Sequence, residues 1–363
     1  MKRLAVFVTA LFMIYAASFA VAGNRCCTPM VTPQADPDVL YPIGAATGFG
    51  YIDKTGAVVV KPLLDLANQF CEGLALVKSR DDEYFFINHT GKKAFALEFT
   101  PEPRGCNGYS DGLAAVRQND IPGFIDKTGK FVIAPQFDSV GNFNNGRAFV
   151  TNDLKNYYID RSGKKVFDAP EGCSSNFSEG MLACSSGTKA GQGYLDTSGS
   201  WVLQPKYDAT RQFTEGLAFV KLKYPNAREY GIIDKTGKLV AEPRFFYVLP
   251  FSEGLAFVKY YENTKEVHGY VDHSGAVVLK LAIDIEGVFN DSSFSDGLAL
   301  VKVKDKGYNQ YKYGYIDKTG KFVIPPQFAS AEPFYAGMAL VEFKDSGRAY
   351  IDKTGKTVWS RKK

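Results

Sequence analysis

A short phrase recurs along almost the whole chain and limits its fold more than any other feature. In the clearest copy, residues 314–326, one apolar run ends in Asp317 to Gly320 (Asp-Lys-Thr-Gly) and a second ends in Pro325-Pro326. Asp suits the first position of a type I turn, and Gly suits the left-handed residue that closes it as a bulge. The flanking runs alternate and are rich in Tyr, Phe, Val and Ile, which is typical of half-buried strands. The phrase predicts a β-hairpin whose second strand stops at the prolines.

The same turn occurs nine times along the chain. Its first residue recurs 34 to 45 residues apart, at Asp53, Asn88, Asp126, Asp160, Asp196, Asp234, Asp272, Asp317 and Asp352. A period of this size indicates tandem structural repeats and takes precedence over other interpretations of the fold.

A second phrase, Phe-Ser-Glu-Gly-Leu-Ala-x-Val, alternates with the first, as in residues 251–258. Its Gly supplies a positive φ before a strand. Each unit is therefore predicted to hold three antiparallel strands, with the connector forming a fourth short one. Aromatic residues of the connectors should fill the core between units, because a three-stranded unit cannot bury its own apolar face. Examples are Phe137, Phe143, Phe328 and Phe334.

We therefore predict an all-β fold of nine tandem antiparallel units, each of three to four strands, over residues 38–359, followed by a short tail at 360–363. An open superhelical, solenoid-like array is expected, because closed propellers usually have about four to eight blades and neither end shows a split unit. A closed β-propeller-like ring is the alternative, since a fourth strand would make each unit blade-like.

The N-terminus resembles a secretory signal peptide. Residues 1–22 carry Lys2 and Arg3, then an apolar run, then Ala20-Val21-Ala22. Residues 23–37 show no periodicity and are expected to be a leader or linker. Export to the periplasm or the extracellular space is predicted, with no transmembrane segment after cleavage. The formal net charge of +4 gives no reason to expect nucleic-acid binding.

The chain has six cysteines, and an even number in an exported protein favours disulfides. Cys173 and Cys184 form the best local pair because they bracket one loop of one repeat. Cys71 and Cys106 lie in equivalent regions of neighbouring units and could join them. The adjacent cysteines at 26–27 stay unassigned. A zinc site is the alternative, although no Cys-x-x-Cys or nearby His supports it.

The two phrases together resemble the WG-repeat family of bacterial proteins, and the resemblance covers roughly Asp38 to Trp359. The family is named for Trp-Gly before the first strand of its phrase. Here that Trp is replaced by Phe49, Pro122, Gln192, Tyr230, His268 or Tyr313. The resemblance implies export or envelope association and a non-catalytic role in interaction. It supplies no catalytic residues.

The polar residues also argue against an enzyme, because the same Asp and Glu recur in every unit, whereas a catalytic pair needs one geometry at one place. Turn and cap chemistry explains such residues first; a glycoside hydrolase stays the least favoured alternative. The three histidines (His89, His268 and His273) form no Ser-His-Asp set. We therefore predict no catalytic residue, no cofactor and no metal.

Function should lie where the units differ most, in the loops between Leu-Ala-x-Val and Gly-Tyr-Ile-Asp. Three of these loops are long, at residues 221–230, 259–268 and 302–313. They contain Lys residues and a set of candidate binding tyrosines: Tyr224, Tyr230, Tyr260, Tyr261, Tyr308, Tyr311 and Tyr313. Tyr is well suited to contacts with proteins or sugars. The sequence thus predicts an exported protein-interaction scaffold, with binding of cell-envelope carbohydrate as the alternative and ordinary solvated loops as the simplest explanation.

Overall fold

The computed structural model describes residues 39–101, 108–173, 176–187, 191–223, 229–282, 292–304, 311–344 and 347–361. All the regular elements of these residues are strands. They form nine antiparallel units, here called blades 1 to 9 in chain order. No helix in the described part of the chain is long and apolar enough to cross a membrane.

The first four blades are separate small sheets. Blade 1 contains β1 (Tyr41–Ala45), β2 (Gly48–Ile52) and β3 (Val58–Leu64); blade 2 contains β4 (Leu66–Ala67), β5 (Ala75–Lys78), β6 (Tyr84–Ile87) and β7 (Lys93–Ala96); blade 3 contains β8 (Thr100–Pro101), β9 (Ala114–Gln118), β10 (Ile121–Ile125) and β11 (Phe131–Ile133); blade 4 contains β12 (Ser139–Val140), β13 (Ala148–Asn152), β14 (Lys155–Ile159) and β15 (Lys165–Asp168).

Blades 5 to 7 share one continuous sheet, because β18 and β21 each pair with strands of two blades. The strands are β16 (Leu182–Ser185), β17 (Gln192–Leu195), β18 (Trp201–Thr210), β19 (Leu217–Leu222), β20 (Tyr230–Asp234), β21 (Leu239–Val248), β22 (Ala256–Glu262), β23 (Lys265–Val271) and β24 (Val277–Lys280).

Blades 8 and 9 are again four-stranded. Blade 8 contains β25 (Phe294–Ser295), β26 (Leu298–Lys304), β27 (Tyr311–Ile316) and β28 (Phe322–Phe328); blade 9 contains β29 (Ser330–Ala331), β30 (Met338–Phe343), β31 (Gly347–Asp352) and β32 (Thr357–Ser360). The fourth, connector strand predicted from the sequence is thus present in most blades.

The Asp-Lys-Thr-Gly turn has the predicted geometry. Asp317 Oδ1 accepts from the backbone N and hydroxyl of Thr319 (2.8 and 2.6 Å) and from Lys321 N (3.1 Å). Gly320 has φ +81°, and the register shifts at the neighbouring Ile316, as a bulge requires.

The prolines after this turn do not end the strand as predicted. β28 continues through Pro325-Pro326 to Phe328. The strand is the outermost of its blade, and an edge strand tolerates Pro because one row of its N–H groups faces away from the ladder. The pairing shifts across the prolines, from Tyr315↔Ile324 to Tyr313↔Phe328.

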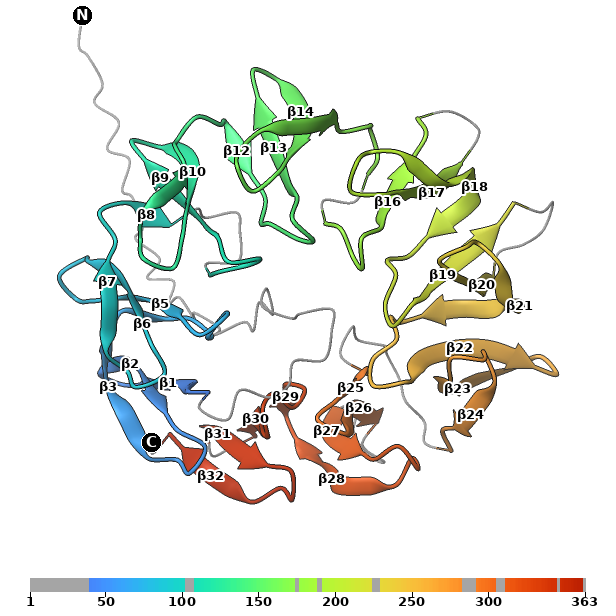
Figure 1. Cartoon of the computed structure of the whole chain (residues 1–363). Coiled ribbons are helices and arrows are strands. Elements are labelled where there is room, and N and C mark those ends of the chain that lie inside the picture. The colour runs from blue at the N-terminus through green and yellow to red at the C-terminus, as the bar shows by residue number, and fades with distance from the viewer. Residues whose placement is uncertain are drawn as a thin grey trace, which may run out of the picture.

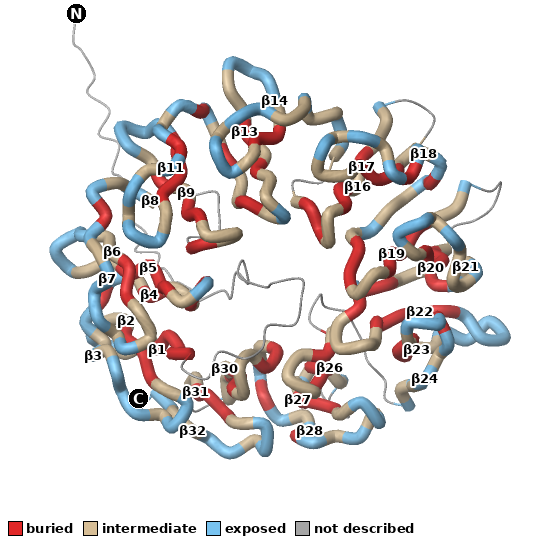
Figure 2. The backbone as a smooth tube through the Cα atoms, viewed as in Figure 1, coloured by how far each residue is buried: buried red, intermediate tan, exposed pale blue. Residues whose placement is uncertain are grey.

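The core lies between blades, as predicted for units that cannot bury their own face. One cluster joins Tyr315 and Phe328 of blade 8 to Phe334 and Val341 of blade 9. The predicted connector aromatics Phe137, Phe143, Phe328 and Phe334 are all buried. Figure 2 shows buried residues along the inner strands and exposed residues along the outer edge.

The blades stand round a central axis, and blade 9 lies beside blade 1 (Figure 1). One apolar cluster contains Tyr41 and Ile52 of blade 1 with Met338 and Tyr350 of blade 9. Two hydrogen bonds cross the same junction, from Tyr41 Oη to Ala336 O (2.6 Å) and from Tyr350 Oη to Pro42 O (2.9 Å).

The nine tandem antiparallel units are confirmed, but their arrangement is the ring given as the alternative rather than an open array. The prediction of an open array relied on the number of units and on the absence of a split unit. The structure shows no strand shared between blades 9 and 1 in the residues it describes. Side-chain packing and hydrogen bonds join the two ends instead.

Candidate functional site

Each blade has two ends with different chemistry. In an antiparallel sheet successive turns alternate between the two ends. The Glu-Gly turn and the Asp-Lys-Thr-Gly turn therefore lie on one face of the ring, here called the turn face. The loops between the second and third strands lie on the other, here called the loop face.

On the turn face, a side-chain oxygen from each of blades 2 to 8, a carboxylate in all but blade 4, binds the next blade. Glu253 accepts a hydrogen bond from Gly297 N of the following blade (3.0 Å). Lys318 Nζ, from the Asp-Lys-Thr-Gly turn of that same blade, lies 3.4 Å from the Glu253 carboxylate and donates to Glu253 O (2.8 Å). The Glu-Gly phrase of one repeat and the Lys of the next are thus parts of one contact, here called a latch.

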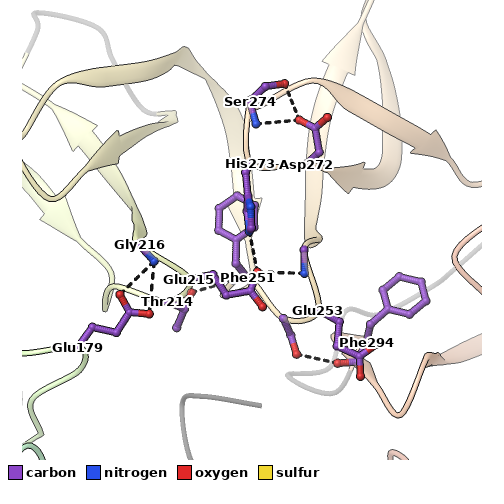
Figure 3. Close-up of polar contacts among 12 residues, drawn as sticks. Glu179, Thr214, Glu215, Gly216, Phe251, Glu253, Asp272, His273, Ser274 and Phe294 are labelled. Atoms are coloured by element: carbon purple, nitrogen blue, oxygen red, sulfur yellow. Dashed lines mark hydrogen bonds and ion pairs between the residues drawn. The ribbon is translucent and has the colours of Figure 1, made fainter.

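The latch recurs from blade to blade. The acceptors Glu72, Asp111, Asn145, Glu179, Glu215, Glu253 and Asp296 bind the amides of Gly112, Gly146, Gly180, Gly216, Gly254, Gly297 and Gly337, respectively. Figure 3 shows Glu179 on Gly216 and the neighbouring contact of His273 with Glu215. The repeated acids therefore have a structural role, as the sequence indicated. This role is to join neighbouring blades and not only to close turns.

The backbone at these acids is unusual for a turn. Glu253 has φ +54° and Gly254 has φ +85°, and Ser252 and Leu255 exchange backbone hydrogen bonds (2.9 and 3.2 Å). This is a two-residue type I′ turn, in which Asn, Asp or Gly is preferred at the first position. Glu is not a preferred residue at this position, so its recurrence was the sequence signal for an additional contact. That contact is the hydrogen bond to the Gly amide of the next blade.

A second row of bonds runs beside the latches. Ser252 Oγ donates to Phe294 O of the next blade (2.7 Å), and Ser110 and Ser295 make the same bond to Phe143 O and Phe334 O (2.6 Å each). At Thr214 the direction reverses, because Phe251 N donates to its hydroxyl (3.0 Å). The Phe-Ser-Glu-Gly phrase is therefore explained by contacts between blades.

The histidines are also engaged in local contacts. His273 Nε2 lies 2.7 Å from the Glu215 carboxylate, where most latches have a Lys. His268 Nε2 lies 2.7 Å from Glu266 Oε1, and this bond holds the pKa of Glu266 below its usual value. The His89 ring stacks on Phe70 at 5.1 Å. Across the described residues, no three His, Cys, Asp or Glu side chains are grouped as a metal site would need.

Two of the seven candidate tyrosines do not lie on the surface. Tyr230 and Tyr260 are only 7% and 6% exposed and belong to one core cluster with Phe245. Phe245 pairs with both residues across neighbouring strands, so their rings face the core between blades 6 and 7. Their proposed place in a binding surface is therefore incorrect. Tyr224 and Tyr308 lie outside the described residues.

The other three candidates remain on the loop face, in blades 7 and 8. Tyr261 is 58% exposed and stacks on Phe246 at 4.8 Å between ring centroids. Tyr311 and Tyr313 are half-buried, with Lys302 Nζ lying 4.2 and 5.8 Å from their ring centroids. Phe246 was missed by the sequence analysis because it precedes the loop and belongs to the connector end of β21.

The predicted disulfide between Cys173 and Cys184 is present. Cys71 is also disulfide-bonded, and Cys106, its partner in the sequence-based hypothesis, lies outside the described residues.

Nine antiparallel blades round one axis, joined by repeated latches, define a β-propeller-like repeat protein. A family model described as "WG containing repeat" matches the chain five times, at residues 49–81, 123–155, 193–224, 230–263 and 313–345. The chain therefore belongs to the WG-containing repeat proteins, as its phrases indicated. A comparison with curated proteins finds no significant match.

Solved structures resemble the fold at low sequence identity. One titled as a eukaryotic initiation factor has a TM-score of 0.57 and 12% identity, covering 90% of this chain and 96% of that one. BamB from Moraxella catarrhalis has a TM-score of 0.41 and 11% identity, covering 77% of this chain and 93% of its own. At such identities the likeness concerns the fold alone.

Proposed function

We propose that this protein is an exported, non-catalytic scaffold that binds another protein through its loop face. The observation that carries the proposal is a stacked aromatic pair in blade 7, in which Tyr261 is exposed and Phe246 is half-buried, followed in blade 8 by the Lys302–Tyr311–Tyr313 group. Large aromatic side chains, Tyr in particular, are enriched at protein interfaces and at their energetic centres. The disulfide Cys173–Cys184 supports export, because disulfides persist in oxidising compartments.

The difference between the two faces supports a binding role rather than a catalytic one. On the turn face, the repeated carboxylates are used by turns and latches. On the loop face, the loops differ in length from blade to blade: Asp153 and Leu154 alone close the β13–β14 hairpin, whereas residues 305–310 separate β26 from β27. Variable loops on a rigid frame are where binding residues are usually found.

The test compares three forms of the purified protein as bait in an envelope extract, with bound proteins measured by quantitative mass spectrometry. One form is unchanged, one carries Phe246→Ser and Tyr261→Ser, and one carries Val278→Ser. Val278 is the matched control, because it is 53% exposed on the outer strand of the same blade. We expect the double variant to lose a partner that the control retains.

Retention of every partner by the double variant and by a second one with Tyr311→Ser and Tyr313→Ser would contradict the proposal. The same proteins on a glycan array test the carbohydrate alternative. Binding there that depends on Tyr261, without any protein partner, would replace the proposed function with carbohydrate binding.

A further inference from the structure

One of the latches described above uses an amide in place of a carboxylate. At the junction of blades 4 and 5 the acceptor is Asn145, whose Oδ1 accepts a hydrogen bond from Gly180 N of blade 5. The next residue is Gly146, and the two residues have φ +52° and +75°, as expected for the type I′ turn that all the latches share. This latch is therefore built on an Asn-Gly pair.

The neutral side chain fits the rest of this junction. The other latch junctions have Lys, Arg or His at the second position of the Asp turn, but blade 5 has Thr197 there. A carboxylate at residue 145 would lack the turn cation that Lys318 supplies to Glu253. Arg147 adds a bond to a neutral group instead, because its Nε donates to Thr197 O (2.7 Å). An amide is thus a suitable acceptor here, but an amide can lose ammonia, which a carboxylate cannot.

An Asn followed by Gly can lose ammonia without the help of another protein. The backbone nitrogen of the Gly forms a bond to Cγ of the Asn, which closes a five-membered succinimide. The Cγ–Nδ2 bond breaks, and the amide leaves as ammonia with the proton of the attacking N–H. Water then opens the succinimide at either carbonyl and leaves Asp or isoaspartate. Gly favours this attack, because it has no Cβ to shield its nitrogen or to restrict its backbone.

The folded ring keeps the two reacting groups apart. Gly146 N donates to Asp111 Oδ2 of blade 3 (2.6 Å), whereas the Asn145 side chain is bound to Gly180 of blade 5. The nucleophile is thus held by the preceding blade and the side-chain carbonyl by the following one. A type I′ turn also has ψ of about +30° at its first central residue, which directs the next nitrogen away from Cβ. Reaction requires the side chain to leave its latch and the turn to rotate.

We propose that Asn145 is a deamidation site that the two flanking latches keep closed, and that it reacts when the junction of blade 4 with blade 3 or blade 5 opens. Folded proteins open locally, and a slow reaction of the open form proceeds at a rate set by the population of that form. The isoaspartate product carries its free carboxylate directly on Cα, too short to reach Gly180 N. The modification therefore removes the latch between blades 4 and 5. The proposal does not depend on the loop face.

The sequence has a second Asn-Gly pair, at residues 107–108, which lies outside the described residues. The two pairs fall in different tryptic peptides, because trypsin cuts after Arg117 and Lys130. Peptide mapping by mass spectrometry therefore measures the reaction of Asn145 separately.

The test follows conversion of Asn145 to Asp and isoaspartate during incubation of the purified protein at mildly alkaline pH. The unchanged protein unfolded in urea should react at least about tenfold faster than the same protein folded. Asp111→Ala, which removes the acceptor of Gly146 N, should speed the reaction of the folded protein about fivefold or more. The matched control is Glu253→Ala, which removes the latch between blades 7 and 8 and should leave the rate at Asn145 unchanged.

Equal rates in the folded and the unfolded protein would overturn the proposal, as would no reaction in the unfolded chain. A rate that Asp111→Ala leaves unchanged, or that Glu253→Ala raises equally, would also overturn it. The comparison of folded with unfolded protein needs no substitution, so a folding defect of a variant cannot hide the result. The isoaspartate form, separated by ion exchange, should unfold at a lower temperature than the unreacted protein, and an equal midpoint would contradict the loss of the latch.

Discussion

At the scale of single residues, the turn Asp has nearly the same environment in every copy. The pKa of all eight such carboxyls lies below the ordinary value of 3.8, first because of the hydrogen bond from the Thr or Ser hydroxyl two residues later. A carboxyl with a lowered pKa in the folded state stabilises the fold above its unfolded pKa and loses that contribution as the pH falls.

Blade 2 supplies an uncharged version of the same turn. Asn88 Oδ1 accepts from Thr90 N, the Thr90 hydroxyl and Lys92 N, at 3.0, 2.7 and 3.2 Å. We predict that Asn88→Asp raises the midpoint of thermal unfolding slightly at pH 7 and leaves it unchanged at about pH 2, well below the ordinary pKa of Asp. Circular dichroism measures both values.

The reverse change, Asp317→Asn, serves as the control and should lower the midpoint at pH 7 only. An effect of either substitution that is the same size at both pH values would show that charge is not what the turn uses.

At the scale of elements, the latch decides how neighbouring blades are held. The Glu253 side chain is 18% exposed, and its removal leaves Gly297 N without its acceptor. We predict that Glu253→Ala lowers the free energy of unfolding by about 1–2 kcal/mol. Glu253→Gln should cost less, because an amide oxygen still accepts from Gly297 N. Denaturant titration measures the differences.

The matched control for this prediction is Glu262→Ala. Glu262 pairs with Lys280 of the same blade at 2.8 Å and is half exposed, so its loss should change the free energy of unfolding by less than about 0.5 kcal/mol. Equal effects at Glu253 and Glu262 would mean that the latch contributes no more than an ordinary surface ion pair.

The disulfide Cys173–Cys184 joins the connector of blade 5 to β16, over a sequence separation of 11. Closing a loop of this size restricts the unfolded chain, so the double variant Cys173→Ser and Cys184→Ser should lose about 2–3 kcal/mol of unfolding free energy. The free energy of unfolding of the unchanged protein and of the double variant is compared without reductant, and then again with it. If reductant lowers this free energy equally in both forms, this disulfide is not the source of the loss.

At the scale of the whole molecule, the ring depends on the contact of blade 9 with blade 1. Tyr41, Ile43 and Ile52 are each less than 5% exposed, and blade 9 covers them. We predict that removing residues 330–363 destabilises the entire ring rather than one terminal repeat, because it exposes faces of both blade 8 and blade 1. Thermal unfolding should then lose its single cooperative transition.

Small-angle scattering gives an independent check of the same point. The unchanged protein should scatter as a compact ring, and the truncated form as a more extended particle. A truncated form with unchanged cooperativity and only one unit less stability would indicate an open array in solution.

The sequence alone was sufficient for the turns, the repeat and the aromatic core between units, but not for the strand end at Pro325-Pro326, the burial of the loop tyrosines or the closure of the ring. Alternation and turn chemistry act over a few residues, so Asp317, Gly320 and the hairpins were predictable. Tyr260 and Tyr261 are adjacent in the sequence, yet one is buried and the other exposed. Neighbouring strand residues point to opposite faces, and only the packing of blades decides which face meets the core.

The sequence by itself determined the unit: strand order, turn type, the Cys173–Cys184 pair and the core aromatics, since each depends on neighbours within one repeat or the next. The tertiary structure decided how the nine units are arranged, which is as a closed ring. Ring closure depends on the small rotation between successive blades, which no single repeat encodes visibly. That closure places Tyr350 beside Pro42 and packs blade 9 against blade 1.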